Sequence, residues 1–441
     1  MKTIFDFNRI AATVLALGLS FHAVAEIRDT TLSASLEYKE ELGYFQKANR
    51  DLGDPIFMLY DAKAGLDFGI GGSVRARSAY DFFGSLESGT TFNPAMISVP
   101  TDYSNTFWTA VSGSEIHVKA RYHMKDHKVI AFLKFGGGST NSVSVSEAYV
   151  SIDGFSCGLI PSFFMDLEVG YLMTGAAVSS PVKYVHPLFG YKRKFGEHWL
   201  LGVSAESPTL SLPGWLAGQY GLAPDNQAVP DLTFHAKYRW KSGHIQLGTL
   251  LRNIKYWSYN PNAPVSYQYS ALGITGYELG YGLSLTGNQR LNRMVKLSAE
   301  FVYGKGISRY LELFNNQISD LGMCNDAAED GLFRMKALPV LHGVLAAQID
   351  WSEKFTSTVL FSYAKSFEVD GVSVPNFNRN DFTRIFESGM TANANLFWHI
   401  SPNAYAGIEA MFGHSHLRNT YLLPDDHGTL ARTMISFAFM F

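Results

Sequence analysis

Basic residues recur two positions apart in several segments of this sequence. Arg75 and Arg77 form one such pair, and Lys237 and Arg239 form another. Side chains at positions i and i+2 of a β-strand lie on the same face of that strand. Each pair would therefore hold two fixed positive charges side by side. Such charges attract and concentrate small anions without making or breaking any bond.

Two acids offer the opposite charge. Asp166 and Glu168 stand in the segment MDLEVGYLMTGAAVSSP, which shows no strand alternation. Loops that fold inward set the bore of many barrels. If this segment folds into an opening lined by Arg75, Arg77 and Arg121, the acids and bases create a transverse electric field there. The alternative is a loop that lies over the top of the molecule.

The usual signatures of metal and catalytic sites do not occur in the sequence. His414 and His416 place two imidazoles on one strand face, but a metal site needs further ligands, and none is evident beside them. Phosphate-binding loop, Gly-x-Ser-x-Gly and His-Glu-x-x-His patterns are absent. The sequence therefore predicts no enzyme, no cofactor and no metal. A Ser–His pair inside a barrel, as in an outer-membrane phospholipase, stays open as an alternative.

Composition bounds the kind of protein that positions these charges. The chain has 441 residues, of which 46% are hydrophobic, 14% aromatic and 17% charged, so it is not a disordered chain. The formal net charge of −3 argues against a nucleic-acid partner, because nucleic-acid binders are usually basic. Residues 1–25 have the basic start, short apolar stretch and Ala-Val-Ala ending of a cleaved signal peptide. No later apolar run suits a transmembrane helix, which leaves a soluble exported protein or a membrane β-barrel.

The dominant period of the hydrophobic pattern is two, which indicates β-strands. In LTFHAKYRW, which begins at Leu232, apolar side chains alternate with Thr, His, Lys and Arg. A soluble sandwich would alternate in the same way, but these runs are longer than the roughly 5 to 6 residues of an average globular strand. We predict sixteen strands, near residues 70–81, 112–122, 127–136, 143–153, 156–164, 183–195, 198–207, 231–241, 243–257, 272–286, 293–305, 333–350, 354–367, 385–399, 403–417 and 429–441.

The gaps between these strands alternate between short and long. Seven short turns and eight longer loops are the organisation of an outer-membrane barrel with both termini on the periplasmic side. Four of the seven tryptophans, Trp199, Trp240, Trp351 and Trp398, stand beside a predicted short turn, as expected at a membrane–water interface. The fold class is therefore all-β: a single transmembrane antiparallel barrel of about sixteen strands over residues 70–441. The short turns are centred on Met124-Lys125-Asp126, Gly154-Phe155, Gly196-Glu197, Ser242-Gly243, Gly287-Asn288, Ser352-Glu353 and Ser401-Pro402.

In such a barrel the apolar register faces lipid and the other register lines the lumen. The lumenal register collects 12 basic and 6 acidic residues. A lumen with an excess of one charge concentrates the opposite ion, so we predict a mild preference for small anions such as carboxylates. An ordinary mixed polar lumen is the alternative. The residues predicted to line the channel or its constriction are Arg75, Arg77, Lys119, Arg121, Asp166, Glu168, Lys237, Arg239, Arg252, Lys296 and Glu409.

The two ends of the chain lead to separate expectations. Residues 26–69 are charged and loosely helical, and a periplasmic helix, a small plug and an ordered arm all stay open for them. The chain ends in TMISFAFMF, with Ile435, Phe437, Phe439 and Phe441 in the lipid-facing register. We expect this strand to close the barrel against the first one, which leaves no free edge. A final Phe also resembles the signal read by the barrel assembly machinery, which is the partner predicted for Phe441.

Several short motifs resemble those of the DcaP-like trimeric porins of Gram-negative outer membranes, over roughly residues 65–441. PSFFMDL is similar to that family's Trp-Ser-x-Phe-x-Asp segment at Ser162, Phe164 and Asp166. VPDLTFHAKYRW resembles its Pro-Asp-Leu strand start. GYGLSLTG, GKGISRY and the hairpin NLFWHISPNAYAGIEAMFG are similar too.

The resemblance implies a sixteen-stranded homotrimer embedded in outer-membrane lipid and lipopolysaccharide. It also implies an N-terminal periplasmic segment and passive diffusion of small anionic solutes such as dicarboxylates. The chain departs from the family's pattern at Pro161, where the family has Trp, and at Lys134, where we expect an acid. Ser144, Ser146 and Glu147 stand where the family tends to carry lumenal arginines. These departures concern the solute more than the fold.

Three functions are compatible with these observations, and a passive outer-membrane porin is the one we favour. The alternatives are a barrel hydrolase and a soluble exported β-rich adhesin or binding protein. Heat-modifiable migration on a gel distinguishes a barrel from a soluble protein. Liposome swelling distinguishes a porin from a hydrolase.

Overall fold

The computed structural model describes most of the chain after residue 56. The predicted signal peptide and most of the segment 26–69 lie outside the described residues, so the expectations for them stay predictions. The described residues are 57–61, 65–87, 91–103, 105–111, 113–124, 127–139, 142–174, 181–210, 212–262, 273–314, 317–421, 423 and 425–441.

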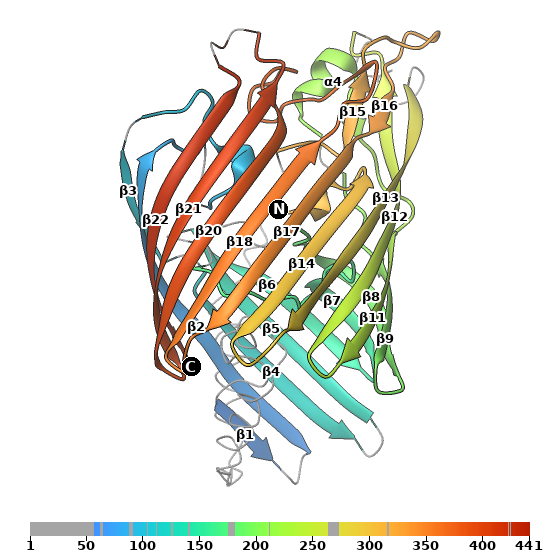
Figure 1. Cartoon of the computed structure of the whole chain (residues 1–441). Helices are drawn as coiled ribbons and strands as arrows, with labels where there is room; N and C mark the ends of the chain where they lie inside the picture. The colour runs from blue at the N-terminus through green and yellow to red at the C-terminus, as the bar shows by residue number, and fades with distance from the viewer. Residues whose placement is uncertain are drawn as a thin grey trace.

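Sixteen long strands form one closed antiparallel barrel in the described part of the chain (Figure 1). Each of the sixteen predicted strands has a counterpart in it, so the predicted fold class is confirmed. Around the barrel the strands are β2 (Leu66–Phe83), β4 (Glu115–Met124), β5 (His127–Ser139), β6 (Ser142–Ile152), β7 (Phe155–Pro161), β8 (Val185–Phe195), β9 (Trp199–Glu206), β11 (Asp231–Trp240), β12 (Gly243–Tyr259), β13 (Gly273–Arg290), β14 (Val295–Lys305), β17 (Pro339–Asp350), β18 (Phe355–Ser366), β20 (Ile385–Ser401), β21 (Ala404–Arg418) and β22 (His427–Met440).

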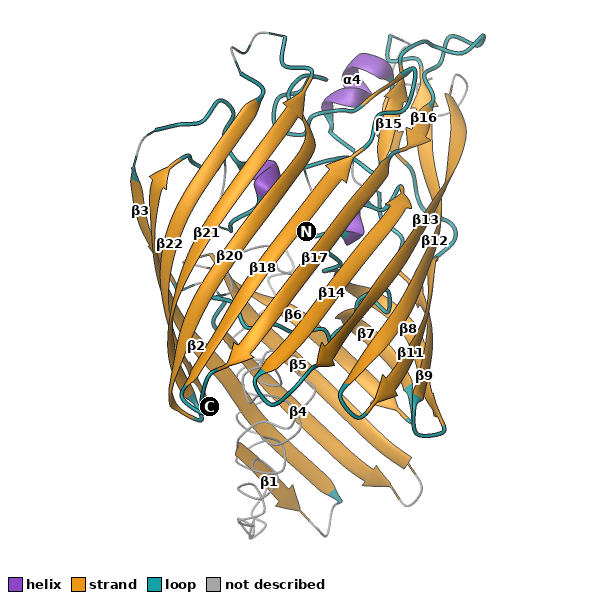
Figure 2. Ribbon diagram, in the orientation of Figure 1, coloured by secondary structure: helices purple, strands orange, loops and turns teal. Residues whose placement is uncertain are grey.

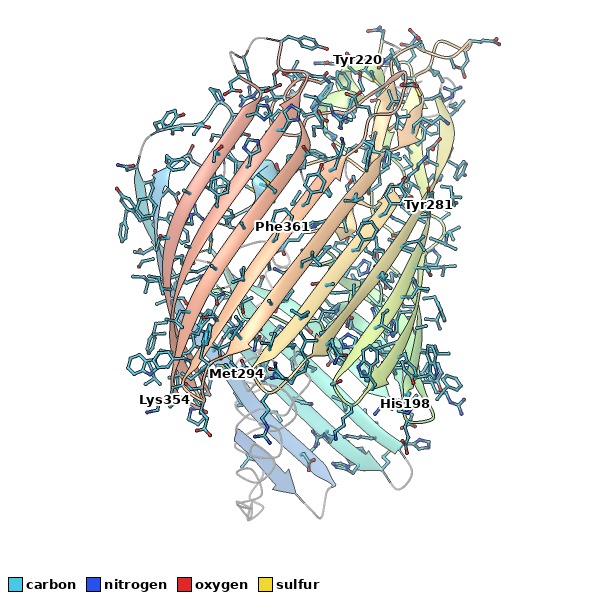
Figure 3. The ribbon with its side chains drawn as sticks, in the orientation of Figure 1. His198, Tyr220, Tyr281, Met294, Lys354 and Phe361 are labelled. Carbon is cyan, nitrogen blue, oxygen red and sulfur yellow. The ribbon has the colours of Figure 1, made fainter. Side chains whose placement is uncertain are left out.

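The two faces of the barrel wall differ in polarity. In β11, Leu232 and Phe234 are 46% and 43% exposed on the outside. Thr233 and Lys237 of the same strand are buried on the inside. Phe361 likewise points outward from the middle of β18 (Figure 3). Because strand side chains alternate between the two faces, the period-two pattern of the sequence becomes an apolar exterior and a polar interior.

The barrel closes between β2 and β22, as the sequence predicts. Ser73 pairs with Met440, and the two strands continue in antiparallel register toward Asp81 and Arg432. At the end of the seam, the amides of Gly72 and Phe441 each donate to the other residue's carbonyl, at 2.9 and 3.0 Å. The last strand therefore has no open edge along this pairing.

One end of the barrel is formed by tight turns, and the C-terminus lies there (Figure 1). Trp199, Trp351 and Trp398 lie beside these turns with about half of their surface exposed. The predicted turn at Gly287-Asn288 is wrong, because both residues lie inside β13, and the chain turns at residues 291–294 instead. The predicted alternation of short and long connections is also wrong between β5 and β6. The sequence predicts a longer loop there, but Ser139 pairs with Ser142, so the two strands continue almost to their connection at the long-loop end of the barrel.

The other end carries the longer loops and their short elements (Figure 2). A small sheet of β15 (Leu321–Cys324), β16 (Met335–Ala337) and β19 (Val372–Ser373) lies there with the helix α4 (Trp215–Tyr220). None of the helices in the described ranges has the length and apolar character that a bilayer-spanning helix requires. Further short elements are β1 (Phe57–Asp61), β3 (Thr106–Ala110), β10 (Leu222–Pro224) and the 3₁₀ turns η1 (Pro94–Met96) and η2 (Ser308–Tyr310).

Candidate functional site: a lumen narrowed by two inward loops

The connection between β7 and β8 folds into the barrel, and we call its described part, residues 162–174, the inward loop. Phe163 and Phe164 are almost fully buried, which anchors the start of the loop against the inner wall. Leu172, near its far end, packs with Phe397 and Tyr405 of β20 and β21. The loop therefore does not lie over the top of the barrel but runs along the inner wall from β9 to β21.

Glu206, at the end of β9, fastens the start of the inward loop. Its carboxylate accepts hydrogen bonds from the Ser162 hydroxyl at 2.8 Å and from the Phe163 amide at 2.9 Å. His186 of β8 lies 2.7 Å from the same carboxylate. Glu206 is completely buried, so these bonds satisfy a carboxylate that water does not reach.

Asp166 binds the next part of the loop to three neighbouring strands. One of its oxygens lies 2.7 Å from the Lys237 ammonium of β11. The other lies 2.8 Å from His244 Nε2 of β12 and accepts a 2.7 Å hydrogen bond from Thr286 of β13. Burial opposes ionisation, but Lys237 and His244 outweigh it and hold the pKa of Asp166 well below its usual range.

Glu168 makes the second ion pair of the loop. Its carboxylate accepts a 2.9 Å hydrogen bond from Arg239 Nε and lies 3.2 Å from the Lys237 ammonium. Burial alone would raise the pKa of Glu168, but the hydrogen bond to Arg239 and the two positive charges lower it to about 2. Asn288 donates a 2.9 Å hydrogen bond to the Glu168 carbonyl. Both acids of the loop are therefore neutralised by bases of the wall against which they pack.

The far end of the loop is held by polar side chains of the opposite flank. Tyr171 donates a 3.0 Å hydrogen bond to Glu300 of β14, and Lys296 donates to the Gly170 carbonyl. The Thr174 amide donates to the Glu409 carboxylate of β21 at 2.8 Å. These contacts extend over the strands from β14 to β21, so the loop occupies a large part of the lumen's circumference.

A second loop, between β14 and β17, also enters the lumen. Tyr310 donates a 2.9 Å hydrogen bond to Asp231 and lies 3.3 Å from Glu206, which joins the two loops. Arg252 of β12 is held by Asp231 at 2.9 Å and by Asp320 of this loop at 2.8 Å. Arg252 is 3% exposed, so its charge serves this network and is not presented to water.

The wall formed by β2, β4, β5 and β6 carries the remaining predicted charges. In the order of the strands, β2 is seven strands away from β11, and β6 is four strands away from it. Arg121 is 3.4 Å from Asp67, and Lys134 is ion-paired with Glu147. These four strands contain six bases, namely Arg75, Arg77, Lys119, Arg121, Lys128 and Lys134, and four acids, namely Asp67, Asp81, Glu115 and Glu147.

The predicted transverse field must be corrected. Asp166 and Glu168 form their ion pairs with Lys237 and Arg239, not with the arginines of the opposite wall. Four of the residues predicted to line the channel are almost completely buried. The side chains of Lys237 and Arg252 are 4% and 2% exposed, and those of Asp166 and Glu409 are 0% exposed. The predicted set therefore separates into loop anchors and a basic wall. The anchors are Asp166, Glu168, Lys237, Arg239, Arg252, Lys296 and Glu409, and the wall residues are Arg75, Arg77, Lys119 and Arg121.

The comparison with known proteins identifies the fold. The outer membrane channel DcaP of Acinetobacter baumannii is 16% identical over 87% of this chain and 99% of that protein, with a TM-score of 0.67. An anion-selective porin from Comamonas acidovorans is 9% identical over 85% of this chain and 100% of that protein, with a TM-score of 0.51. The chain has a DcaP-like porin fold. No protein-family model matches the sequence, and no curated protein matches it.

Within this DcaP-like fold, the short motifs singled out in the sequence meet in space. Ser162 and Asp166 come from PSFFMDL, and both bind the inner wall. Asp231 comes from VPDL and Tyr310 from GKGISRY, and these two side chains bond to each other. Asp231 and Tyr310 are not among the predicted site residues, although the motifs that contain them were an available signal. His186, His244 and Asp320 are not among them either, and no motif in the sequence points to these three.

Proposed function

We propose that this chain is a passive porin of a Gram-negative outer membrane, in which small hydrophilic solutes diffuse through a water-filled lumen. The observation that carries the proposal is a closed barrel with an apolar exterior, a charged interior and loops folded inward. A soluble adhesin would not expose so many large apolar side chains over a continuous wall. We place the barrel in the membrane with its tight turns facing the periplasm and its long loops facing the outside, as in other outer-membrane barrels.

We further propose a preference for small anions. Both loop acids form ion pairs with the wall against which they pack, and the strands β2, β4, β5 and β6 together carry six bases and four acids. A lumen with a net positive wall raises the local concentration of anions. The similar fold of a porin described as anion-selective agrees with this proposal.

Dicarboxylates are the anions that suit this wall best. Arg75 and Arg77 share one face of β2, and both side chains lie near Gly113: a Cβ added at Gly113 would lie 3.5 Å from an Nη atom of Arg77 and 3.8 Å from Arg75 Cδ. Two guanidinium groups on one strand face can each donate paired hydrogen bonds to a carboxylate. A solute with two carboxylates would engage both arginines in one passage.

The proposed assembly is a homotrimer in contact with lipid and lipopolysaccharide. The exposed faces of Trp199, Trp351 and Trp398 near the tight turns suit the membrane–water interface on the periplasmic side of the outer membrane. The terminal Phe441 is proposed as the residue that the barrel assembly machinery reads. The trimer rests on the resemblance to DcaP-like porins, and three-step closure in single-channel recordings would demonstrate it.

Ion selectivity in a planar bilayer tests the proposal. Under a KCl gradient the reversal potential should show that chloride is more permeant than potassium. Liposome swelling should be faster with succinate than with a neutral solute of similar size. Clear cation selectivity would overturn the anion preference and leave the porin proposal standing. Lipid hydrolysis without solute entry would overturn the porin proposal itself.

A further inference from the structure

Three histidines and an aspartate gather at the long-loop end of β21 and β22, away from the lumen. His416 and His427 are direct cross-strand partners, and His414 is paired with Thr429 two positions nearer the membrane. The buried Ser415 between the two β21 histidines faces inward. All three imidazoles therefore lie on the outer face of the barrel. The rings are stacked, with centroids 4.5 Å apart for His416–His427 and 5.2 Å apart for His414–His427.

The nitrogens of two of these rings converge on one carboxylate. His416 Nε2 lies 3.3 Å from one oxygen of Asp426, and His427 Nε2 lies 3.0 Å from the other. One ligand atom from each of the three residues falls within 4.8 Å of the others. The side chains of His416, His427 and Asp426 are 28%, 49% and 45% exposed, so an ion from solution reaches them without any movement of the backbone.

A second carboxylate is placed to orient one of the imidazoles. Glu387 Oε2 lies 3.6 Å from Nδ1 of His416, the ring nitrogen that does not face Asp426. Glu387 stands at a β-bulge in β20, between Phe386 and Ser388, and bulges redirect side chains in this way. Metal-binding histidines characteristically donate their second ring nitrogen to a carboxylate, which leaves the first nitrogen free to coordinate.

We infer that His416, His427 and Asp426 form a binding site for a divalent transition-metal ion, with Zn²⁺ as the leading candidate. Two imidazoles and one carboxylate are a common three-residue set for zinc, whose fourth position is then taken by water or another ligand. Calcium and magnesium prefer oxygen ligands alone, so the two imidazoles favour the zinc class. A bound ion would attach the loop between β21 and β22 to the barrel wall. This inference does not depend on the proposed channel function.

Zinc binding by the full chain, purified in detergent without a polyhistidine tag, tests the inference. We expect the protein to retain about one Zn²⁺ per chain after dialysis, measured by elemental analysis, and to bind Zn²⁺ in isothermal titration. The double variant H416A/H427A should lose this binding. The variant E387Q should weaken it by about 10- to 100-fold, the usual effect of removing a residue that orients a metal ligand.

The matched control is H127A. It removes a histidine that is paired with Asp153 at the opposite end of the barrel, and this pair contains a single imidazole. Its zinc binding should equal that of the unaltered protein. Heat-modifiable migration shows whether each variant is folded, and D426N replaces the double variant if that one fails to fold. Equal zinc uptake by the unaltered protein and by the folded ligand variants would overturn the inference. So would calcium binding of equal strength.

Discussion

At the scale of single residues, Asp166 is the centre of the inward loop's attachment. It is completely buried in its side chain and bonded to Lys237, His244 and Thr286. Removing one member of a buried ion pair destabilises a protein far more than replacing both members, because it leaves the other charge buried without a partner. The stability of the loop therefore depends on the match between Asp166 and Lys237 and not on either charge alone.

The variant K237M tests this dependence. It leaves Asp166 buried without its ammonium partner, which should destabilise the loop by about 3–5 kcal/mol. We expect larger and noisier single-channel currents and a lower temperature for the heat-modifiable transition. The double variant D166N/K237M should recover much of the loss, whereas K241M, which alters an exposed lysine of the next turn, should behave normally. Currents of K237M that match those of the unaltered protein would contradict this account.

The loop's carboxylates also predict how the channel responds to acid. The pKa of Glu168 is lowered to about 2 by Arg239 and Lys237, against about 4.3 in an unfolded chain. A group with a depressed pKa contributes stability that is present above the unfolded value and is lost as the pH falls through the folded value. The attachment that Glu168 provides should therefore stay constant from neutral pH to about pH 4 and be lost only as Glu168 protonates. The variant E168Q should show unstable single-channel conductance already at neutral pH; E168Q channels as steady at neutral pH as those of the unaltered protein would refute the prediction.

At the scale of elements, the long strands could be predicted because each of their faces is uniform. All sixteen were found from the period-two pattern together with the lengths and spacing of the runs, and β22 closes on β2 as expected. The error at Gly287-Asn288 has a physical reason: Asn288 is not in a turn but points inward and bonds to the Glu168 carbonyl. The real turn is stabilised by Asn292, whose side chain accepts hydrogen bonds from the amides of Met294 and Val295. Composition alone does not distinguish these two asparagines.

The short elements and the loop anchors could not be predicted in the same way. Strands such as β10, with three residues, are too short to show a period. The pairing of Asp166 with Lys237 joins residues 71 positions apart through the path of a loop, which no local pattern encodes. The sequence indicated which charges point inward. Which of them meet, and which remain toward the lumen, is decided by the two loops that cover the wall.

The closing seam between β2 and β22 supports a prediction about assembly. Deleting Phe441 removes its two backbone hydrogen bonds with Gly72 and an aromatic ring that lies against Gly72. We expect a lower level of folded protein in the outer membrane, measured by heat-modifiable migration, whereas the channels that do form should conduct normally. The control F437A removes another outward ring and keeps the backbone pairing, so it should assemble better. Normal folded levels after the deletion would contradict the prediction.

At the scale of the whole molecule, the proposed anion preference rests on the numbers of bases and acids along the lumenal wall. Asp166 and Glu168 form ion pairs with Lys237 and Arg239 of the wall that binds the inward loop, and the wall of β2, β4, β5 and β6 carries more bases than acids. Replacing Arg75 and Arg77 with Glu changes its six bases and four acids into four bases and six acids. The sign of the wall's net charge is thereby reversed while the loop anchors are untouched.

The variant R75E/R77E should therefore change the channel from anion-selective to cation-selective, with a reversal potential of opposite sign under the same KCl gradient. The shift should be large at about 0.1 M salt, where charges act over about 10 Å, and small at about 1 M, where they are screened within about 3 Å. The control K354E adds an acid to an exposed turn outside the lumen and should leave selectivity almost unchanged. Both variants lower the net charge of the protein. A change of selectivity in R75E/R77E alone would therefore show that the charge of the lumenal wall sets selectivity, and not the net charge. An equal shift in the two variants would show that selectivity arises elsewhere in the barrel.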